Sequence, residues 1–198
     1  MSGGLRAAII GAGVIADYHA AALAGVRGAT LTAVCDVSRA RAAALAGRCH
    51  ATAYTSVDEL LERGQPQVVH ICTPPDLHGD LALQCLAAGT HVFLEKPMGV
   101  SAADCERMIA AARANGRALG VNHTLLHYPV FERLRDDLRR GRIGRADHVR
   151  IAWNKELPFL RFGPFDARML RAPGNVVLEL GSHLTALLID LLGPPGPL

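Results

Sequence analysis

The stretch IIGAGVIA, residues 9–16, decides the fold of this chain. It places Gly11, Gly13 and Ala16 in a GxGxxA spacing, after an apolar run that predicts a strand and before an Ala-rich run that predicts a helix. In this setting the first glycine permits a tight turn, the second lets the backbone approach a pyrophosphate, and the small third residue lets the helix pack on the strand. The loop residues expected to contact a dinucleotide are Gly11, Gly13, Val14 and Ile15.

An acidic residue stands at the C-terminal end of the next predicted strand. Asp36 ends the stretch LTAVCD, where an acidic side chain can accept hydrogen bonds from an adenosine ribose and repel a 2′-phosphate. This favours NAD as the cofactor. NADP remains the alternative, because Arg39 or Arg41 could reach a phosphate from the following turn. A simpler interpretation also stays open, in which the glycines only shape a turn and Asp36 only caps a helix.

Short apolar runs alternate with amphipathic Ala/Leu-rich stretches over the first 121 residues. The expected strands are 5–11, 30–35, 68–72, 91–94 and 118–121, and the expected helices are 14–24, 39–48, 56–63, 78–88 and 101–115. This alternation predicts an α/β fold of the Rossmann type, with a doubly wound parallel sheet. After Val121 a helical stretch at 128–141 and a strand at about 146–156 predict an incomplete α+β substrate domain over residues 122–198.

Composition excludes several function classes. The 21 Lys and Arg residues are scattered among 18 Asp and Glu, without a basic run, so a nucleic-acid surface is not expected. No apolar segment approaches the roughly 18 to 20 residues that cross a bilayer. The five cysteines lack the spacing of metal ligands, so no metal site is expected. They fit buried thiols in a reducing cytoplasm, and the partner expected is a small molecule.

The ordered series GAGVIA, TPPDLH, AGTHVFLEKP, RIG and LELGSH resembles the glucose-fructose oxidoreductase / inositol dehydrogenase (Gfo/Idh/MocA) family. The resemblance covers nearly the whole chain. It implies an NAD(P)-dependent dehydrogenase that transfers a hydride between a nicotinamide and a secondary alcohol of a sugar, cyclitol or related polyol. Family members continue well past LELGSH, so the resemblance also implies a chain shortened at its C-terminus.

The resemblance assigns roles to individual residues. The cofactor-facing residues that it implies are Thr73, Pro74, His78, Glu95 and Lys96. Lys96 is also implied to lie in the active site, with Pro97 after a cis peptide bond that fixes where the lysine points. For His78, a histidine that merely caps or packs in the first turn of its helix is the competing interpretation.

The stretch VLELGSHLTALL, residues 176–187, predicts a helix that carries Glu179 and His183 four residues apart on one face. The resemblance implies that His183 takes the hydroxyl proton, Glu179 orients it, and Lys96 stabilises the developing alkoxide. The family usually has Asp where Glu179 stands, and often a further Asp at the position of Ala186. A buried polar pair that only ties the helix to a sheet is the alternative.

Substrate contacts are expected from polar residues beyond the last strand of the first domain, namely Asn122, Trp153, Arg168 and Asn175. Two other functions stay open. The chain could be an NAD-binding but inactive truncated homologue or partner subunit, or its scaffold could use transient oxidation to drive another reaction such as glycoside cleavage. A homo-oligomer or a complementing second chain would cover the strand edge left exposed by the short second domain.

Overall fold

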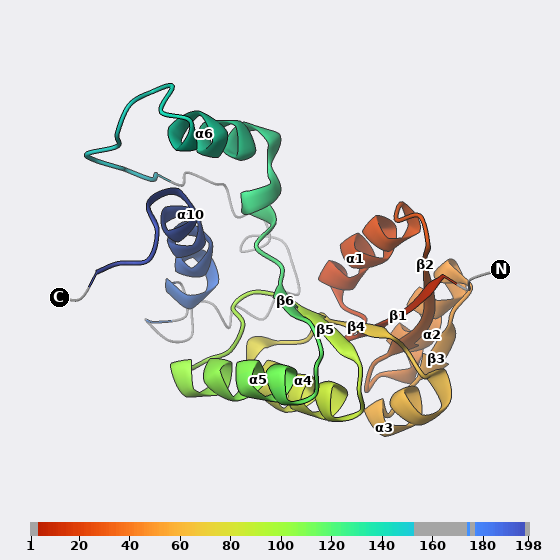
Figure 1. Cartoon of the computed structure of the whole chain (residues 1–198). Helices are drawn as coiled ribbons and strands as arrows, with labels where there is room; N and C mark the ends of the chain where they lie inside the picture. Colours follow the sequence, from red (N-terminus) through yellow and green to blue (C-terminus); the bar gives the residue numbers. More distant parts are fainter. Residues whose placement is uncertain (1–3, 153–173, 175–176, 197–198) are drawn as a thin grey trace. The chain divides into compact units, whose positions relative to one another are not determined.

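A computed structural model gives the structure of residues 4–152, 174 and 177–196 (Figure 1). The chain divides into two compact units, Met1–Asn122 and His123–Leu198. This division falls one residue after the boundary expected from the sequence.

The first unit is built on a six-stranded sheet in the order β3-β2-β1-β4-β5-β6. All five neighbouring pairs of strands are parallel, which confirms the predicted Rossmann sheet. The order reverses between β1 and β4, so the chain leaves these two strands in opposite directions and opens a crevice at their carboxyl ends. The strands are β1 (Leu5–Ile10), β2 (Ala29–Cys35), β3 (Thr52–Tyr54), β4 (Val68–Ile71), β5 (His91–Leu94) and β6 (Leu119–Val121).

The helices of this unit lie close to their predicted positions. They are α1 (Val14–Ala24), α2 (Arg39–Cys49), α3 (Val57–Glu59), α4 (His78–Ala87) and α5 (Ala102–Ala114), with a π-helical turn η1 (Leu60–Gly64) and a 3-10 turn η2 (Pro75–Leu77). Serine side chains cap the N-termini of three of them, α2, α3 and α5. Ser38 accepts a hydrogen bond from the backbone of Arg41, and Ser101 accepts one from the backbone of Asp104. These N-caps satisfy amides that have no partner within the helix.

Two apolar layers cover the sheet, one on each face. Along β1, Ala7 and Ile9 pack with α1 and α2, whereas Ala8 and Ile10 pack with α4 and α5. Figure 1 shows α1 on one side of the sheet and α4 and α5 on the other. Because both faces are covered, most side chains of these strands are apolar on either face, with no strict alternation. His70, in the central strand β4, is one of the polar exceptions.

The second unit contains a 3-10 turn η3 (Thr124–His127), helix α6 (Pro129–Arg139), a π-helical turn η4 (Val177–Gly181) and helix α10 (Ser182–Leu192). Asp190 joins α6 to α10, because its carboxylate lies 3.4 Å from Arg135 and 3.6 Å from Arg139. The single helix expected over 176–187 is therefore a π-turn that runs into an α-helix. Glu179 lies in the first and His183 in the second.

Two predictions about strands need correction. The strand expected at about 146–156 does not form over residues 146–152, and residues 153–156 lie outside the described part of the chain. A strand needs a paired neighbour, and over the described residues all strands belong to the first unit. Sequence reasoning also missed β3, whose three residues are too few to show a period of two. Among the described helices, none is long and apolar enough to span a membrane.

Candidate dinucleotide site

The glycine loop has the geometry that its spacing predicts. Gly11 has a φ of +92°, and a methyl group added there would lie 2.9 Å from the carbonyl of Cys72. Only glycine satisfies both conditions. At Gly13, by contrast, no described atom lies within 4 Å of an added methyl group. Gly13 is the N-cap of α1, so this open space adjoins backbone amides that can bind an anion.

Asp36 lies beside this loop and is held by several donors. Its carboxylate accepts hydrogen bonds from the backbone of Ala12 at 2.8 Å and of Ser38 at 2.7 Å. Arg41 contacts it through Nη2 at 2.7 Å, and both Arg41 and Arg39 are exposed. Burial opposes ionisation of Asp36, but the hydrogen bonds from Arg41, Ser38 and Ala12 outweigh it and lower the pKa of the carboxyl. A ribose would therefore meet a charged acceptor.

A pocket of about 480 Å³ joins the three predicted parts of the cofactor site. Its wall includes Gly11 and Gly13 from the loop, Asp36 from the end of β2, and Thr73 and Pro74 from the end of β4. These residues meet because parallel strands present their carboxyl ends along one edge of the sheet. Val14 and Ile15 follow the loop with 64% and 39% of their surface exposed, respectively, as apolar residues that a ligand could cover.

The Asp36–Arg41 pair gives a test of cofactor preference. In Asp36→Ser the charge that repels a 2′-phosphate is gone, and Arg41 is released to bind that phosphate. We expect the ratio of NADP to NAD affinity to rise about 10- to 100-fold, as gaining a charged hydrogen bond is worth about 1.5–3 kcal/mol. Calorimetric titration of both nucleotides measures it. In the double variant Asp36→Ser, Arg41→Met the ratio of NADP to NAD affinity should fall back. If the single and double variants have the same ratio, Arg41 does not bind the 2′-phosphate.

The lysine segment follows β5. The peptide bond between Lys96 and Pro97 is cis, which confirms the prediction. Glu95 is 8% exposed, and its carboxylate accepts hydrogen bonds from His19 at 2.8 Å and from the Asn122 amide at 2.6 Å. Burial opposes its ionisation, but the hydrogen bonds from His19 and Asn122 outweigh it and lower the pKa of Glu95. The resemblance implies that Glu95 lies near the cofactor, which stays a prediction. The bond between Glu95 and His19 was not predicted.

His78 is wholly buried at the start of α4. Its Nδ1 lies 3.0 Å from the Pro97 carbonyl and its Nε2 lies 2.9 Å from the Thr73 carbonyl. The ring therefore lies behind the pocket wall and binds two backbone segments. Direct contact between this ring and a cofactor, as the resemblance implied, would require the ring to leave these positions.

A second buried histidine contact lies on the α1 face of the sheet. His19 Nδ1 lies 2.9 Å from His70 Nδ1. Both rings pack on Phe93, His19 in a tilted arrangement at a centroid distance of 6.0 Å and His70 edge to face at 5.2 Å. Burial, and then the proximity of His19, lower the pKa of His70 from 6.5 to about 4. At neutral pH His70 is thus uncharged, and one proton suffices for the bond between the two Nδ1 atoms.

His70 should make stability depend on pH. Between about pH 6.5 and 4 the unfolded chain binds a proton at His70 that the folded chain does not, so stability falls as pH falls through this window. The slope has an upper bound of about 1.4 kcal/mol per pH unit. We expect His70→Asn, whose side-chain amide can hydrogen-bond but does not titrate, to lose less stability than the natural chain between pH 7 and pH 5. Chemical unfolding at both pH values measures this, and equal losses would contradict it.

The predicted catalytic pair on the C-terminal helix lies in the second unit. Glu179 and His183 are both half-buried, and the ring of His183 packs edge to face on His123 at a centroid distance of 6.3 Å. The sequence analysis did not predict this contact between His123 and His183. Asn122, predicted to contact substrate, binds Glu95 through its amide. Trp153, Arg168 and Asn175 lie outside the described residues.

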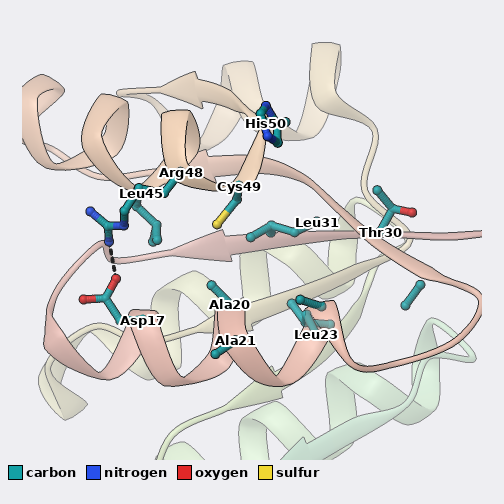
Figure 2. Close-up of a pocket in the computed structure, with 12 residues that line it drawn as sticks. Asp17, Ala20, Ala21, Leu23, Thr30, Leu31, Leu45, Arg48, Cys49 and His50 are labelled. Atoms are coloured by element: carbon teal, nitrogen blue, oxygen red, sulfur yellow. Dashed lines mark hydrogen bonds and ion pairs between the residues drawn. The ribbon is translucent and has the colours of Figure 1, made fainter.

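A larger groove, of about 750 Å³, lies between α1 and α2. Figure 2 shows its apolar side chains Leu23, Leu31 and Leu45, and the Asp17–Arg48 ion pair at one end. Leu31 lies in the amino-terminal half of β2, away from the carboxyl edge where ligands of such sheets bind. The smaller pocket is therefore the better candidate, since it joins the glycine loop to Asp36.

The fold and this pocket define a dinucleotide-binding Rossmann domain. A sequence model described as an oxidoreductase family with an NAD-binding Rossmann fold (GFO_IDH_MocA) matches residues 5–123, more than half of the chain. The chain belongs to this Gfo/Idh/MocA family, as the sequence resemblance predicted.

Known relatives agree with this assignment. A 1,5-anhydro-D-fructose reductase of Ensifer adhaerens is 31% identical over 90% of this chain and 54% of its own length. An inositol 2-dehydrogenase of Salmonella typhimurium is 34% identical over 71% of this chain and 43% of its own length. The crystal structure of the WlbA dehydrogenase of Chromobacterium violaceum, in complex with NADH and UDP-GlcNAcA, superposes with a TM-score of 0.84 at 28% identity, covering 98% of this chain and 57% of that one. The chain thus spans about half the length of the curated relatives it matches.

Proposed function

We propose that this chain binds a nicotinamide dinucleotide and transfers a hydride between it and a secondary alcohol of a sugar, cyclitol or related polyol. The observation that carries the proposal is the pocket in which the glycine loop, Asp36 and the Thr73–Pro74 turn meet. The names of the relatives, a sugar reductase and a cyclitol dehydrogenase among them, support the substrate class.

The residues of this chain would act as follows in that reaction. When bound, the nicotinamide supplies the hydride acceptor or donor. Lys96 places a positive charge beside the substrate oxygen and stabilises the alkoxide that develops there. His183 removes the hydroxyl proton, since an imidazole accepts protons readily near neutral pH, and Glu179 orients it. Reduction of a ketone uses the same groups in reverse.

NAD is the preferred cofactor in this proposal. The ionised carboxylate of Asp36 suits the two hydroxyls of an unmodified adenosine ribose and repels a 2′-phosphate. Its contact with Arg41 keeps a cation within reach, so weaker binding of NADP is part of the proposal.

We propose that substrate recognition falls to Asn122, Trp153, Arg168 and Asn175. For Asn122 the bond to Glu95 supports a place beside the lysine segment. The five cysteines are free thiols, which supports a reducing, cytoplasmic location. Association with a second copy, or with a chain that completes the second unit, is the corresponding proposal for partners.

Two measurements on the chain test this function. Calorimetric titration with NAD and NADP should show binding of NAD, and incubation of the NAD complex with myo-inositol, glucose or a UDP-sugar should then form NADH. NAD binding without NADH formation from any of these classes would favour the inactive homologue or partner subunit. If neither nucleotide binds, the interpretation of the glycine loop is wrong.

A further inference from the structure

Two buried histidines hold the residues on either side of Lys96. His19 binds the side chain of Glu95, the residue before the lysine, and His78 binds the carbonyl of Pro97, the residue after it. We propose that His19 and His78 are positioning residues that transmit occupation of the dinucleotide pocket to Lys96. This inference rests on the proposed function, since it assigns a ligand to that pocket.

The first arm runs through α1. This helix begins at Gly13, and His19 lies in it on the face that packs against the sheet, with 5% of its surface exposed. Its Nε2 binds Glu95 Oε1 at 2.8 Å, while Glu95 Oε2 accepts the backbone amide of Lys96 at 3.3 Å. The Asn122 amide, after β6, binds Glu95 Oε1 as well. A shift of the N-terminal end of α1, where the phosphates would bind, would therefore displace the Lys96 backbone through the Glu95 carboxylate.

The second arm runs through the loop after β4. Thr73 and Pro74 line the pocket, and the Thr73 carbonyl lies 2.9 Å from His78 Nε2. On the other side of the ring, Nδ1 lies 3.0 Å from the Pro97 carbonyl. Both partners are acceptors, so the ring joins the pocket loop to the lysine segment by donating hydrogen. A neutral imidazole carries one N–H, so it donates to one of the two carbonyls and lies in contact with the other.

Packing alone does not explain these two residues. Apolar side chains would fill both positions without the free-energy cost of burying polar atoms that need hydrogen-bond partners. His19 instead makes hydrogen bonds through both ring nitrogens, to Glu95 and to His70. Each histidine belongs to a helix that starts beside the pocket. Each also hydrogen-bonds a residue directly next to Lys96, His19 to Glu95 and His78 to Pro97. A positioning role requires such contacts to the same lysine segment.

The lysine content of the chain allows a direct test. Lys96 and Lys155 are its only lysines. In a Lys155→Arg background, reductive methylation with ¹³C-formaldehyde labels Lys96 and the N-terminal amine, and it leaves the lysine charge in place. The NMR signal of dimethylated Lys96 then reports the surroundings of this amine with no need for substrate or turnover. NAD should shift this signal in the otherwise natural chain.

The variants separate positioning from packing. In His19→Leu and His78→Leu we expect calorimetry to show NAD affinity within about threefold of the parent, whereas the NAD-induced shift of the Lys96 signal falls by at least half. His19→Gln and His78→Gln replace the ring N–H with an amide N–H donor, and they should restore most of the NAD-induced shift of the Lys96 signal. Phe93→Leu is the matched control, because Phe93 packs against His19 and His70 by its ring alone, and it should leave the shift unchanged. Circular dichroism confirms that each variant is folded.

The failures are distinguishable. If NAD binds but the leucine variants keep the full shift, or the glutamine variants behave as the leucine variants do, the inference is wrong and the proposed function stands. If the two leucine variants do not fold, the glutamine variants test the inference: it holds if they keep most of the NAD-induced shift and is wrong if they lose it. If NAD does not bind the unmodified chain, both the proposed function and the inference are overturned.

Discussion

Replacing Lys96 with methionine should lower the rate of hydride transfer about 1000-fold while NAD affinity changes little. The alkoxide that develops on the substrate would then lack the adjacent positive charge, and loss of one such electrostatic contact costs about 10²–10³ in kcat. The same lysine holds the hydroxyl group in line with the nicotinamide, so we expect a loss at the upper end of that range. Stopped-flow formation of NADH, with calorimetry of NAD on the same preparation, measures the two quantities separately.

Two further variants of this kind sharpen the result. Lys96→Arg keeps the charge but changes its shape and reach, so we expect an intermediate rate. Arg107→Met removes a half-exposed cation on α5 that pairs with Asp104, and it should leave the rate unchanged. A normal rate in Lys96→Met would remove the lysine from the proposed chemistry.

Gly13→Ala should weaken NAD binding about 10- to 100-fold and leave stability within about 1 kcal/mol of the natural chain. The added methyl group meets no described atom within 4 Å in the free chain, so the fold accommodates it. In the complex it would occupy the space through which a pyrophosphate approaches the α1 amides, and loss of charged hydrogen bonds worth about 1.5–3 kcal/mol gives that range of affinity.

Other glycines provide the comparison. Gly47 in α2 also has open space around an added methyl group, so Gly47→Ala should bind NAD normally. Gly11→Ala should instead destabilise the fold itself, because its φ is positive and the methyl group would lie 2.9 Å from the backbone of Cys72. Thermal unfolding separates these cases. Normal NAD affinity in Gly13→Ala would mean that the dinucleotide does not approach this loop.

The parts of the site that the sequence predicts are those that depend on local chain geometry. The GxGxxA spacing places Gly11 and Gly13 in the right conformations, and the alternation of strands and helices places Asp36 and Thr73 at the same edge. The rule that ligands bind where the strand order reverses then joins them in one pocket. None of these steps needs knowledge of distant side-chain contacts.

The parts that the sequence did not predict depend on contacts between distant segments. The bond of His19 to Glu95 crosses 76 positions, and only the fold reveals it. One signal was present: His19 shares the buried face of α1 with Ala16, Ala20 and Leu23, where a polar residue is unusual. His70 within an otherwise apolar strand was a second. Arg41, not Arg39, reaches Asp36 for a similar reason, since the rotation of α2 relative to β2 decides it.

Every side chain that lines the proposed dinucleotide pocket comes from the first 122 residues. In the proposed function, substitutions at substrate-binding residues of the other unit could therefore change which alcohol is used without altering this pocket. Such a separation would let one ancestral framework diversify across many metabolic tasks, each new specificity inheriting an electron carrier already in place.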